Sequence, residues 1–329
     1  MHEHKQNQCK RKVKNRKNVV GLIIFCITVG IVFLYAYYQN LRKEIDARQK
    51  WLETEKKSVG RYLDWHTGIL LETDGKMGIY RKESGKLIYK EKVDSEDGYL
   101  GMYLFLMGKY LEKTENTDLP EYWKKGISLA LKKIQSLMRD GITQVSEENT
   151  TAYLMDNLEV WKGLHELELA GLEDTQAISE MRKKIQAQIE NIFWDDANQR
   201  WRIIGNSDLY DQTEFYPDGV AQIYPLIYEF PVKEKKKQKV LYDQFTERFQ
   251  WQKLNKKRTG FLWAITGMAA AQMGDINNLV ELIGNYETEY CENRKYPLYT
   301  GEAGWICMEC EKLYRLYERK IKTGFILCA

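Results

Sequence analysis

Residues 260–272 read Gly-Phe-Leu-Trp-Ala-Ile-Thr-Gly-Met-Ala-Ala-Ala-Gln. This stretch is apolar on all sides and rich in small residues, and a helix of that composition is buried. The next segment, about Asn277–Cys291, mixes charged and apolar residues as an amphipathic helix does. It is therefore expected to cover the buried helix. One inner and one outer helix are predicted for this region.

The same contrast between apolar and amphipathic segments recurs at intervals of roughly 40–65 residues, which indicates a repeated helical hairpin. The chain has only five prolines, as expected for helix throughout. We therefore predict an all-α fold, an (α/α) toroid of helical hairpins that gathers the starts of its inner helices at one end. An α-solenoid and a plain bundle remain alternatives. The apolar segments begin near Asp97, Thr151, Pro217, Thr259 and Gly301, and the other amphipathic segments span about Glu121–Met138, Thr175–Phe193 and Lys233–Phe249.

The segment Gly68–Lys92 departs from the helical pattern. Asp74-Gly75 and Ser84-Gly85 are turn signals between short alternating stretches. Such a pattern favours a β-hairpin or an extended loop.

The N-terminus has the pattern of a membrane anchor. The first eighteen residues carry seven Lys/Arg against one acid, and Val19–Tyr38 has no charge. At about 1.5 Å per residue, that uncharged run spans a hydrocarbon core of about 30 Å. A signal peptide would have a shorter apolar region followed by a small-residue cleavage site, and the residues after Tyr38 offer none.

We therefore predict a single-pass protein of the cell membrane. Because the basic residues precede the anchor, the N-terminus is expected in the cytoplasm and the main domain outside the cell. The predicted parts are a cytoplasmic basic tail (1–18), a transmembrane signal anchor (19–38), a membrane-proximal helical linker (39–63) and an ectodomain (64–329).

Charge and residue usage limit the possible functions. The net charge is +3, but without residues 1–43 it is −5, which does not favour nucleic-acid binding. The cysteines of the ectodomain lack zinc-site spacing, so packed thiols are expected, and a disulfide from Cys291 remains open. With only His66 and His165 in the ectodomain, no metal and no cofactor are predicted. The remaining ectodomain cysteines are Cys307, Cys310 and Cys328.

Two acids lie where a loop gives way to an apolar helix. Glu96 is in Ser-Glu-Asp-Gly-Tyr, and Asp218 is in Tyr-Pro-Asp-Gly. Two carboxyls on separate helices are the minimum needed to cleave a glycosidic bond, one as the acid that protonates the leaving oxygen and one as the base that activates water. The alternative is that both acids only cap their helices.

These segments resemble glycoside hydrolase family 8 and, more broadly, the six-hairpin glycosidase superfamily. Ser95-Glu96, Tyr99 and Gly101-Met102 look like the family's acid-bearing segment, and Tyr216-Pro217-Asp218-Gly219 with Pro225 looks like its base segment. Met155-Asp156-Asn157-Leu158-Glu159-Val160-Trp161 is similar to an inner helix whose aspartate holds the sugar. The resemblance implies that Glu96 is the acid, Asp218 the base and Asp156 a substrate-binding residue.

The surroundings of these acids lead to further expectations. Asp94 and Asp97 are like-charged neighbours that should raise the pKa of Glu96. Asp156 follows the start of an apolar helix, so it should face a polar cleft or a partner. The loop acids Asp208 and Asp211 could reach the same cleft. Aromatic rings near the inner-helix starts could stack on sugar faces, and the substrate-binding candidates among them are Tyr99, Tyr216, Trp161 and Trp263.

The sequence thus favours an extracytoplasmic, inverting glycoside hydrolase that cleaves a polysaccharide internally near the membrane, in connection with exopolysaccharide production. An alternative is a non-catalytic glycan-binding or assembly subunit of a polysaccharide synthase complex. A helical scaffold without glycan function is the third possibility. The expected partners are the polysaccharide, the membrane and, in the alternative, the synthase.

Overall fold

The computed structural model describes residues 42–43, 56–114, 119–172, 175–233, 235–254, 262–295 and 299–327. The chain divides into two compact units, Met1–Tyr62 and Leu63–Ala329. Only 42–43 and 56–62 of the first unit are described, and all are helical. The predicted anchor, Val19–Tyr38, and the basic tail lie outside the described residues. Among the residues that are described, no helix combines the length and the apolar character needed to cross a membrane.

The second unit begins with helical residues 63–72 and a β-hairpin, so the predicted hairpin is confirmed. Strands β1 (Ile79–Glu83) and β2 (Lys86–Glu91) pair antiparallel. Their turn residues, Ser84 and Gly85, have φ of 50° and 82°, as the tight turn of a two-residue hairpin requires. The helix continues past Gly68, however, and is followed by Asp74 and Gly75, which also have positive φ.

Most of the remaining elements are helices, so the all-α class is confirmed. The predicted amphipathic segments match the observed helices within a few residues. The apolar segment expected from Thr259 becomes helical only at Thr266, and residues 255–261 are not described. The helices are α2 (Glu96–Thr114), α3 (Glu121–Leu137), α4 (Leu154–Leu169), α5 (Thr175–Phe193), α6 (Val220–Ile227), α7 (Lys235–Phe249), α8 (Thr266–Met273), α9 (Ile276–Tyr286) and α10 (Thr300–Leu327), with short helical turns η1 (Phe215–Gly219), η2 (Trp251–Lys253) and η3 (Glu287–Glu292).

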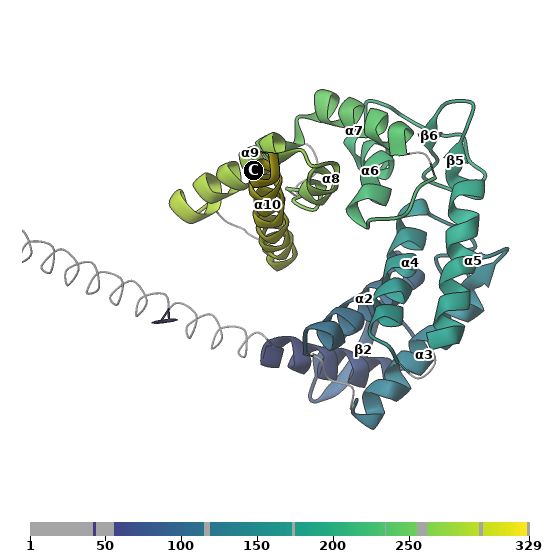
Figure 1. The fold of residues 1–329 in the computed structure, drawn as a ribbon. Helices are drawn as coiled ribbons and strands as arrows, with labels where there is room; N and C mark the ends of the chain where they lie inside the picture. The colour runs from purple at the N-terminus through teal and green to yellow at the C-terminus, as the bar shows by residue number, and fades with distance from the viewer. Residues whose placement is uncertain are drawn as a thin grey trace, which may run out of the picture. The chain divides into compact units, whose positions relative to one another are not determined.

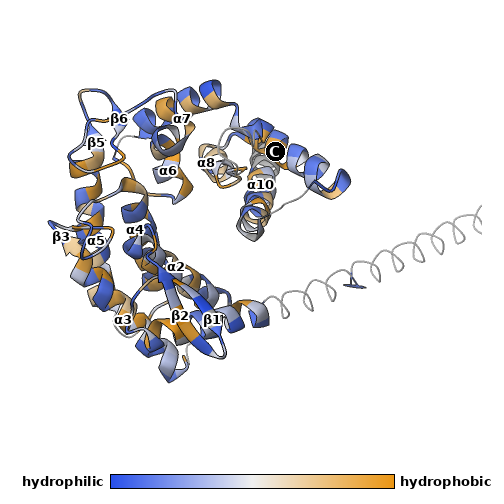
Figure 2. Cartoon of the chain, turned by 180° about the vertical axis from the view of Figure 1, so that it is seen from behind, coloured by the Kyte–Doolittle hydropathy of each residue, from blue (hydrophilic) through white to orange (hydrophobic). Residues whose placement is uncertain are grey.

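The helices of the second unit form two layers. The apolar helices α2, α4, α6 and α8 pack on one another in chain order and α10, which is apolar only near its start, packs on α8, while α3, α5, α7 and α9 each pack beside the inner helix that precedes them (Figure 1). The outer helices α5 and α7 carry both hydrophilic and hydrophobic segments (Figure 2). Alternation of apolar and amphipathic segments in the sequence therefore corresponds to alternation between layers.

Glycines bring α2 and α4 into close contact. A Cβ built on Gly163 would lie 2.2 Å from the carbonyl oxygen of Gly101. A Cβ on Gly101 would lie 2.7 Å from both Cα and N of Val160, and one on Gly108 would lie 2.6 Å from the carbonyl carbon of Glu166. The two backbones therefore approach each other as only glycine permits.

Ion pairs extend this interface towards α6 and α10. Glu166, which is 2% exposed, lies 2.7 Å from the Lys109 ammonium of α2 and 2.8 Å from that of Lys162 in its own helix. Lys162 also approaches Glu229, which follows α6, at 3.3 Å, and Lys312 of α10 pairs with the same carboxylate.

Two short hairpins that were not predicted follow the outer helices α3 and α5. Strands β3 (Met138–Arg139) and β4 (Ile142–Thr143) form the first, and β5 (Trp194–Asp195) and β6 (Arg200–Trp201) form the second. Each strand has only two residues, so it leaves no alternating pattern in the sequence.

An amide side chain from the next inner helix holds each hairpin. Asn157 accepts a hydrogen bond from the Thr143 N–H at 2.8 Å and donates to the Thr143 carbonyl at 3.0 Å. Gln222 does the same with Trp201, at 2.8 and 2.9 Å. Each amide also donates to the carbonyl four residues earlier in its helix, Tyr153 or Asp218. We call this repeated arrangement the amide clamp.

The repeat extends to the helix starts. The N–H of Glu96 donates to the carbonyl of Val145, and the N–H of Leu154 donates to the carbonyl of Ile203, both at 2.9 Å. Val145 and Ile203 each lie two residues beyond the clamped strand residue. The inner helices α2 and α4 therefore begin against the β3–β4 and β5–β6 hairpins, respectively.

The described cysteines correct one expectation. Cys291, Cys307 and Cys310 are free thiols with exposed side chains, so they are not packed in the core as expected. Cys328 lies outside the described residues.

Candidate functional site

The acids at the start of α2 and α4 form a cluster, which we call the acid cluster and define as Asp97, Asp156 and Glu159. Asp97 is fully buried, and its carboxylate accepts hydrogen bonds from the hydroxyls of Ser95 at 2.9 Å and Thr143 at 2.6 Å. Burial raises the pKa of Asp97, although these bonds oppose the shift. Because Thr143 is the clamped residue of β4, Asp97 ties α2 to that hairpin.

Asp156 and Glu159 lie three residues apart in α4, and such residues are neighbours on a helix surface. Burial and the charges of Asp97 and Glu159 raise the pKa of Asp156 to about 8. Burial also raises the pKa of Glu159 to about 7. The pKa values of both carboxyls are thus raised towards neutral pH, which is the range that acid–base catalysis uses.

A glycine of α2 leaves room for this pair. A Cβ built on Gly98 would lie 2.8 Å from Glu159 Oε2 and 3.5 Å from Asp156 Oδ1. It would also lie 2.6 Å from Ser95 Oγ. The two carboxyls and this hydroxyl thus face one point beside the α2 backbone, and a larger side chain there would push them away.

Two tyrosines of the third repeat reach the cluster from α6 and its end. The Tyr224 hydroxyl donates to Glu159 Oε1 at 2.7 Å, and the Tyr228 hydroxyl approaches the same oxygen at 3.4 Å. Burial, followed by the charge of Glu159, raises the pKa of both phenols well above the ordinary value, so they remain protonated donors.

An aromatic pair lies next to the cluster. Tyr216 in η1 and Trp263 have ring centroids 4.7 Å apart, and Tyr216 remains 47% exposed. Burial and then the charge of Asp156 raise the pKa of Tyr216, which places its hydroxyl within the field of the cluster. Trp263 has φ of 56°, a backbone conformation that bulky residues rarely adopt and that often marks functional sites. The exposed ring beside the acids is suited to a sugar face.

Glu96 has different neighbours. Burial raises its pKa, in the predicted direction, but the charged groups with the largest effect are Lys133, Glu147 and Lys92 rather than Asp94 and Asp97. Lys133 belongs to α3, and the other two flank the hairpins. Glu96 is also not among the groups with the largest effect on the pKa of Asp156.

Asp218 is buried in η1 and contributes to the packing of a loop. Its Oδ1 accepts a hydrogen bond from the Asp211 N–H at 2.9 Å, and its exposed fraction is 8%. Hydrogen bonds from Thr213 lower the pKa of Asp211. No hydrogen bond or ion pair links Asp218 to Glu96 within the described segments.

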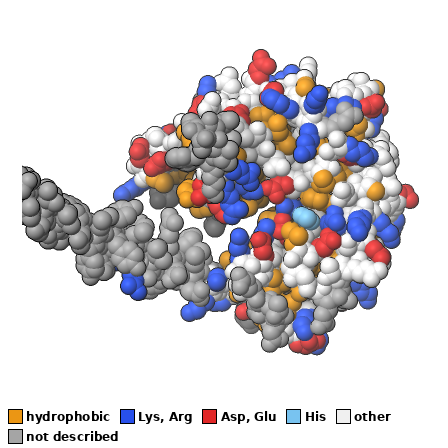
Figure 3. All heavy atoms as spheres, viewed as in Figure 1, with side chains coloured by type: hydrophobic (Ala, Val, Ile, Leu, Met, Phe, Trp, Pro, Cys, Tyr) orange, Lys and Arg blue, Asp and Glu red, His pale blue; other side chains and the backbone are white. Residues whose placement is uncertain are grey.

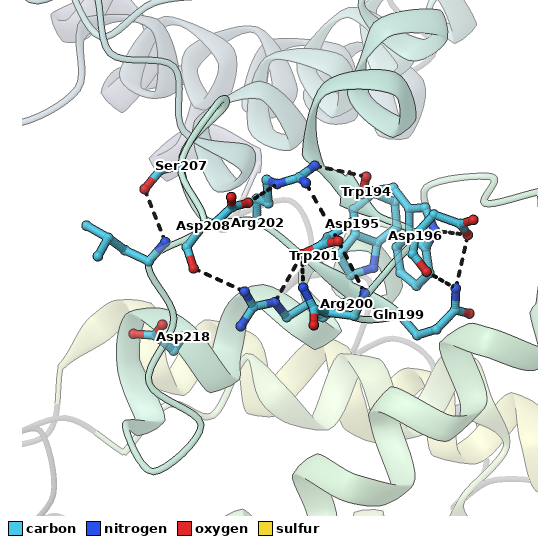
Figure 4. Close-up of polar contacts among 12 residues, drawn as sticks. Trp194, Asp195, Asp196, Gln199, Arg200, Trp201, Arg202, Ser207, Asp208 and Asp218 are labelled. Atoms are coloured by element: carbon cyan, nitrogen blue, oxygen red, sulfur yellow. Dashed lines mark hydrogen bonds and ion pairs between the residues drawn. The ribbon is translucent and has the colours of Figure 1, made fainter.

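An arginine network fixes the start of the same loop to the β5–β6 hairpin (Figure 4). Arg202 pairs with Asp208 at 3.1 Å and with Asp195 at 3.6 Å, and Arg200 donates to the carbonyl of Asp208 at 3.1 Å. Figure 4 shows Asp218 on a separate stretch of chain from these arginines. Asp208 is thus engaged with the hairpin rather than with the acid cluster.

The other aromatic candidates differ in accessibility. Tyr99 of α2 is 47% exposed. Trp161 is 2% exposed, stacks on His165 at 5.2 Å and donates its indole N–H to Gln186 at 3.2 Å. A ring buried in this way has no face open to a sugar, so we leave Trp161 out of the candidate site.

A pocket of about 220 Å³ lies among α5, the β5–β6 hairpin and α7. Its charged side chains are paired within the protein: Lys233 with Glu190 at 2.9 Å, and Lys237 with Asp196 at 3.3 Å. Lys237 also lies 5.4 Å from the centroid of the Trp194 ring. The pocket contains none of the site residues predicted from the sequence.

Over the described part of the chain, no group of three or more His, Cys, Asp or Glu is placed to hold a metal ion. Acidic and basic side chains are interspersed over the face seen in Figure 3.

Sequence reasoning missed Glu159, Tyr224 and Tyr228. The spacing of Asp156 and Glu159 on an apolar helix was a usable signal, because burying two carboxyls on one helix face costs free energy unless they have partners. The Tyr224–Tyr228 pair, one turn apart in α6, gave a second signal. The contact of these tyrosines with Glu159 depends on packing between helices, so no local sequence pattern predicts it.

A scan against models of protein families finds no match to this chain, and a search of curated proteins finds none either.

Proposed function

We propose that this chain is a glycoside hydrolase that cleaves a polysaccharide internally. The observation that carries the proposal is the acid cluster beside the Tyr216–Trp263 pair, in which the Tyr216 ring is exposed. Within the cluster, the pKa of Asp156 is raised to about 8 and that of Glu159 to about 7. Carboxyls with raised pKa next to an aromatic ring are the equipment of a site that binds a sugar and transfers protons to it. The layered helical hairpins are consistent with an (α/α) toroid, which we propose as the finer architecture.

The proposed reaction is inverting hydrolysis. Glu96 gives its proton to the glycosidic oxygen as the bond to the anomeric carbon breaks. Asp218 takes a proton from the water that attacks that carbon, and the products are two shorter chains. Asp156 contacts the sugar at the cleavage point. The raised pKa of Glu96 supports its role as acid. The role of Asp218 rests on the resemblance and requires that the bond from the Asp211 N–H leave its second oxygen available.

We further propose that the enzyme is anchored in the cell membrane, with its N-terminus in the cytoplasm and the domain outside. The uncharged run Val19–Tyr38 after a basic tail supports this topology. A location at the membrane suits an enzyme that acts on a glycan as the cell exports it.

The test is hydrolysis by the purified full-length chain, measured as new reducing ends on a panel of neutral, acidic and amino polysaccharides. Glu96→Gln and Asp218→Asn should each lower turnover by about 10²–10⁴-fold, the usual loss when general acid–base help is removed. Asp208→Asn is the matched control, because its carboxylate is 82% exposed and engaged with Arg202.

The outcomes separate the possible functions. Retained hydrolysis in Glu96→Gln would remove Glu96 as the acid. Polysaccharide binding by the parent without cleavage would favour the subunit of a polysaccharide synthase instead. Neither binding nor cleavage across the panel would overturn the proposal.

A further inference from the structure

We propose that Glu159 is a positioning residue of this site: anchored by the hydroxyls of Tyr224 and Tyr228, it shares a single proton with Asp156, and the proton resides on Asp156. The role of the pair in sugar binding rests on the proposed function, whereas the sharing of the proton does not.

The geometry brings the two carboxyls to one place. They lie on the same face of α4, and Glu159 Oε2 and Asp156 Oδ1 both face the point beside Gly98 that a Cβ would occupy. Two carboxylates in a partly buried space cannot both be ionised without strong repulsion, so one of them retains a proton.

The partners of each carboxyl decide which one keeps the proton. Glu159 Oε1 receives the Tyr224 hydroxyl at 2.7 Å, with the Tyr228 hydroxyl at 3.4 Å. Hydrogen bonds donated to a carboxylate stabilise its ionised form. Asp156 has no tyrosine donor among the contacts of the described residues, and its hydroxyl neighbour Ser95 is shared with Asp97. The proton therefore prefers Asp156.

The electrostatics agree with this assignment. Burial, Asp97 and Glu159 raise the pKa of Asp156 to about 8, above the value of about 7 that burial gives Glu159. None of the groups that most affect either carboxyl is cationic. The titratable groups that face the pair are Asp94 and Asp97 before and within α2, Tyr216 of η1, and Tyr224 and Tyr228 from α6 and its end.

A protonated Asp156 offers the substrate a hydrogen-bond donor and acceptor on one group. An ionised carboxylate would only accept. Near the exposed Tyr216 ring, such a group can hold a sugar hydroxyl in either direction. Glu159 thus affects substrate binding without touching the sugar.

The experiment follows the titration of the Asp156 carboxyl by NMR in full-length protein labelled at aspartate carboxyl carbons. The Asp156 resonance is assigned as the one that disappears in Asp156→Asn. In the parent it should titrate above pH 7. Glu159→Gln removes the like charge and should lower that midpoint by at least one pH unit, a tenfold change in proton affinity. Tyr224→Phe should move it in the same direction, because the proton then shifts towards Glu159.

Tyr242→Phe is the matched control. It removes a hydroxyl that donates to a carboxylate, Asp275, at 2.9 Å between α7 and α9. This change should leave the Asp156 midpoint unaltered. An Asp156 midpoint near pH 4 in the parent would overturn the inference. So would an Asp156 midpoint that is unchanged in both Glu159→Gln and Tyr224→Phe. If Glu159→Gln does not fold, Tyr224→Phe decides alone.

The titration and hydrolysis assays fail independently. If the midpoint shifts but the protein cleaves no polysaccharide, the shared proton is supported and the proposed hydrolase function is rejected. If the protein cleaves a polysaccharide but the midpoint does not shift, the hydrolase function is supported and the shared proton is rejected. Where both hold, the pH at which substrate affinity falls should move down in Glu159→Gln together with the NMR midpoint.

Discussion

Replacing Gly163 with alanine places a methyl group directly against the α2 backbone. The new Cβ would lie 2.2 Å from the Gly101 carbonyl oxygen and 3.2 Å from its Cα. Ordinary carbon–oxygen contacts lie at about 3.3–3.6 Å, so the helices must separate by roughly 1 Å. Because both atoms belong to helix backbones, no flexible side chain can move aside.

Two opposing terms set the magnitude. Alanine favours a helix interior over glycine by about 1 kcal/mol. Overpacking costs about 1–3 kcal/mol and more where the neighbours are rigid. The α2–α4 contact is the most extensive between helices in the described part of the chain, so many side chains lose contact when it widens. We expect a net loss of up to about 2 kcal/mol, or up to roughly 8 °C in the unfolding midpoint.

Urea unfolding of the full-length chain, followed by far-UV circular dichroism, measures this loss. Gly284→Ala is the matched control, because Gly284 lies in α9 and a Cβ there meets nothing within 4 Å. It should gain about 0.5–1 kcal/mol. A Gly163→Ala variant as stable as Gly284→Ala would refute the close approach of α2 and α4.

Three further perturbations test the polar interior. Asn157→Ala opens the first amide clamp and leaves the buried Thr143 N–H without its acceptor, so urea unfolding should show a loss of about 1–3 kcal/mol. Glu309→Gln should reduce the fall in stability between pH 5 and pH 9, measured from the urea midpoint. Burial raises the pKa of Glu309 well above 4.5, so the folded chain keeps a proton that the unfolded chain loses as pH rises. Glu229→Gln should reduce the loss of stability on acidification from pH 5 to pH 2. Burial alone would raise the pKa of Glu229, but Lys312 and Lys162 lower it to about 2. The ionised carboxylate therefore stabilises the folded chain above pH 4.5, and this stabilisation is lost as the pH falls towards 2. If acid unfolding followed by circular dichroism is the same in Glu229→Gln and the parent, that account is contradicted.

The helices could be predicted from the sequence because each carries its own periodic pattern. The amphipathic segment about Thr175–Phe193 coincides with α5, and the turn signal Ser84-Gly85 lies between β1 and β2. The two-residue strands β3 to β6 could not be predicted, because they depend on amides supplied by later helices.

The candidate site was predictable only in part. Asp156 was identified by its unusual place in an apolar helix, but apart from Glu159 the groups around it come from a segment distant in the sequence. Tyr224 contacts Glu159 although the two residues are 65 positions apart in the sequence, and no local pattern predicts that contact. The neighbours of Glu96 depend on how α3 and the hairpins fold over it. The burial of Trp161 likewise follows from its stacking against His165 in the packed interior.

The amide clamp also has a consequence for how the protein is made. Asn157 and Gln222 both come later in the chain than the strand residues they hold, and Gln238 of α7 in turn donates to the Gln222 carbonyl at 2.8 Å. A nascent chain that has emerged only as far as Thr143 has no internal partner for that residue's backbone. The α2–α3 and α4–α5 pairs, with the hairpins that follow them, are each completed by a segment synthesised later. We therefore expect the repeats held by the two amide clamps to be completed in the direction of translation.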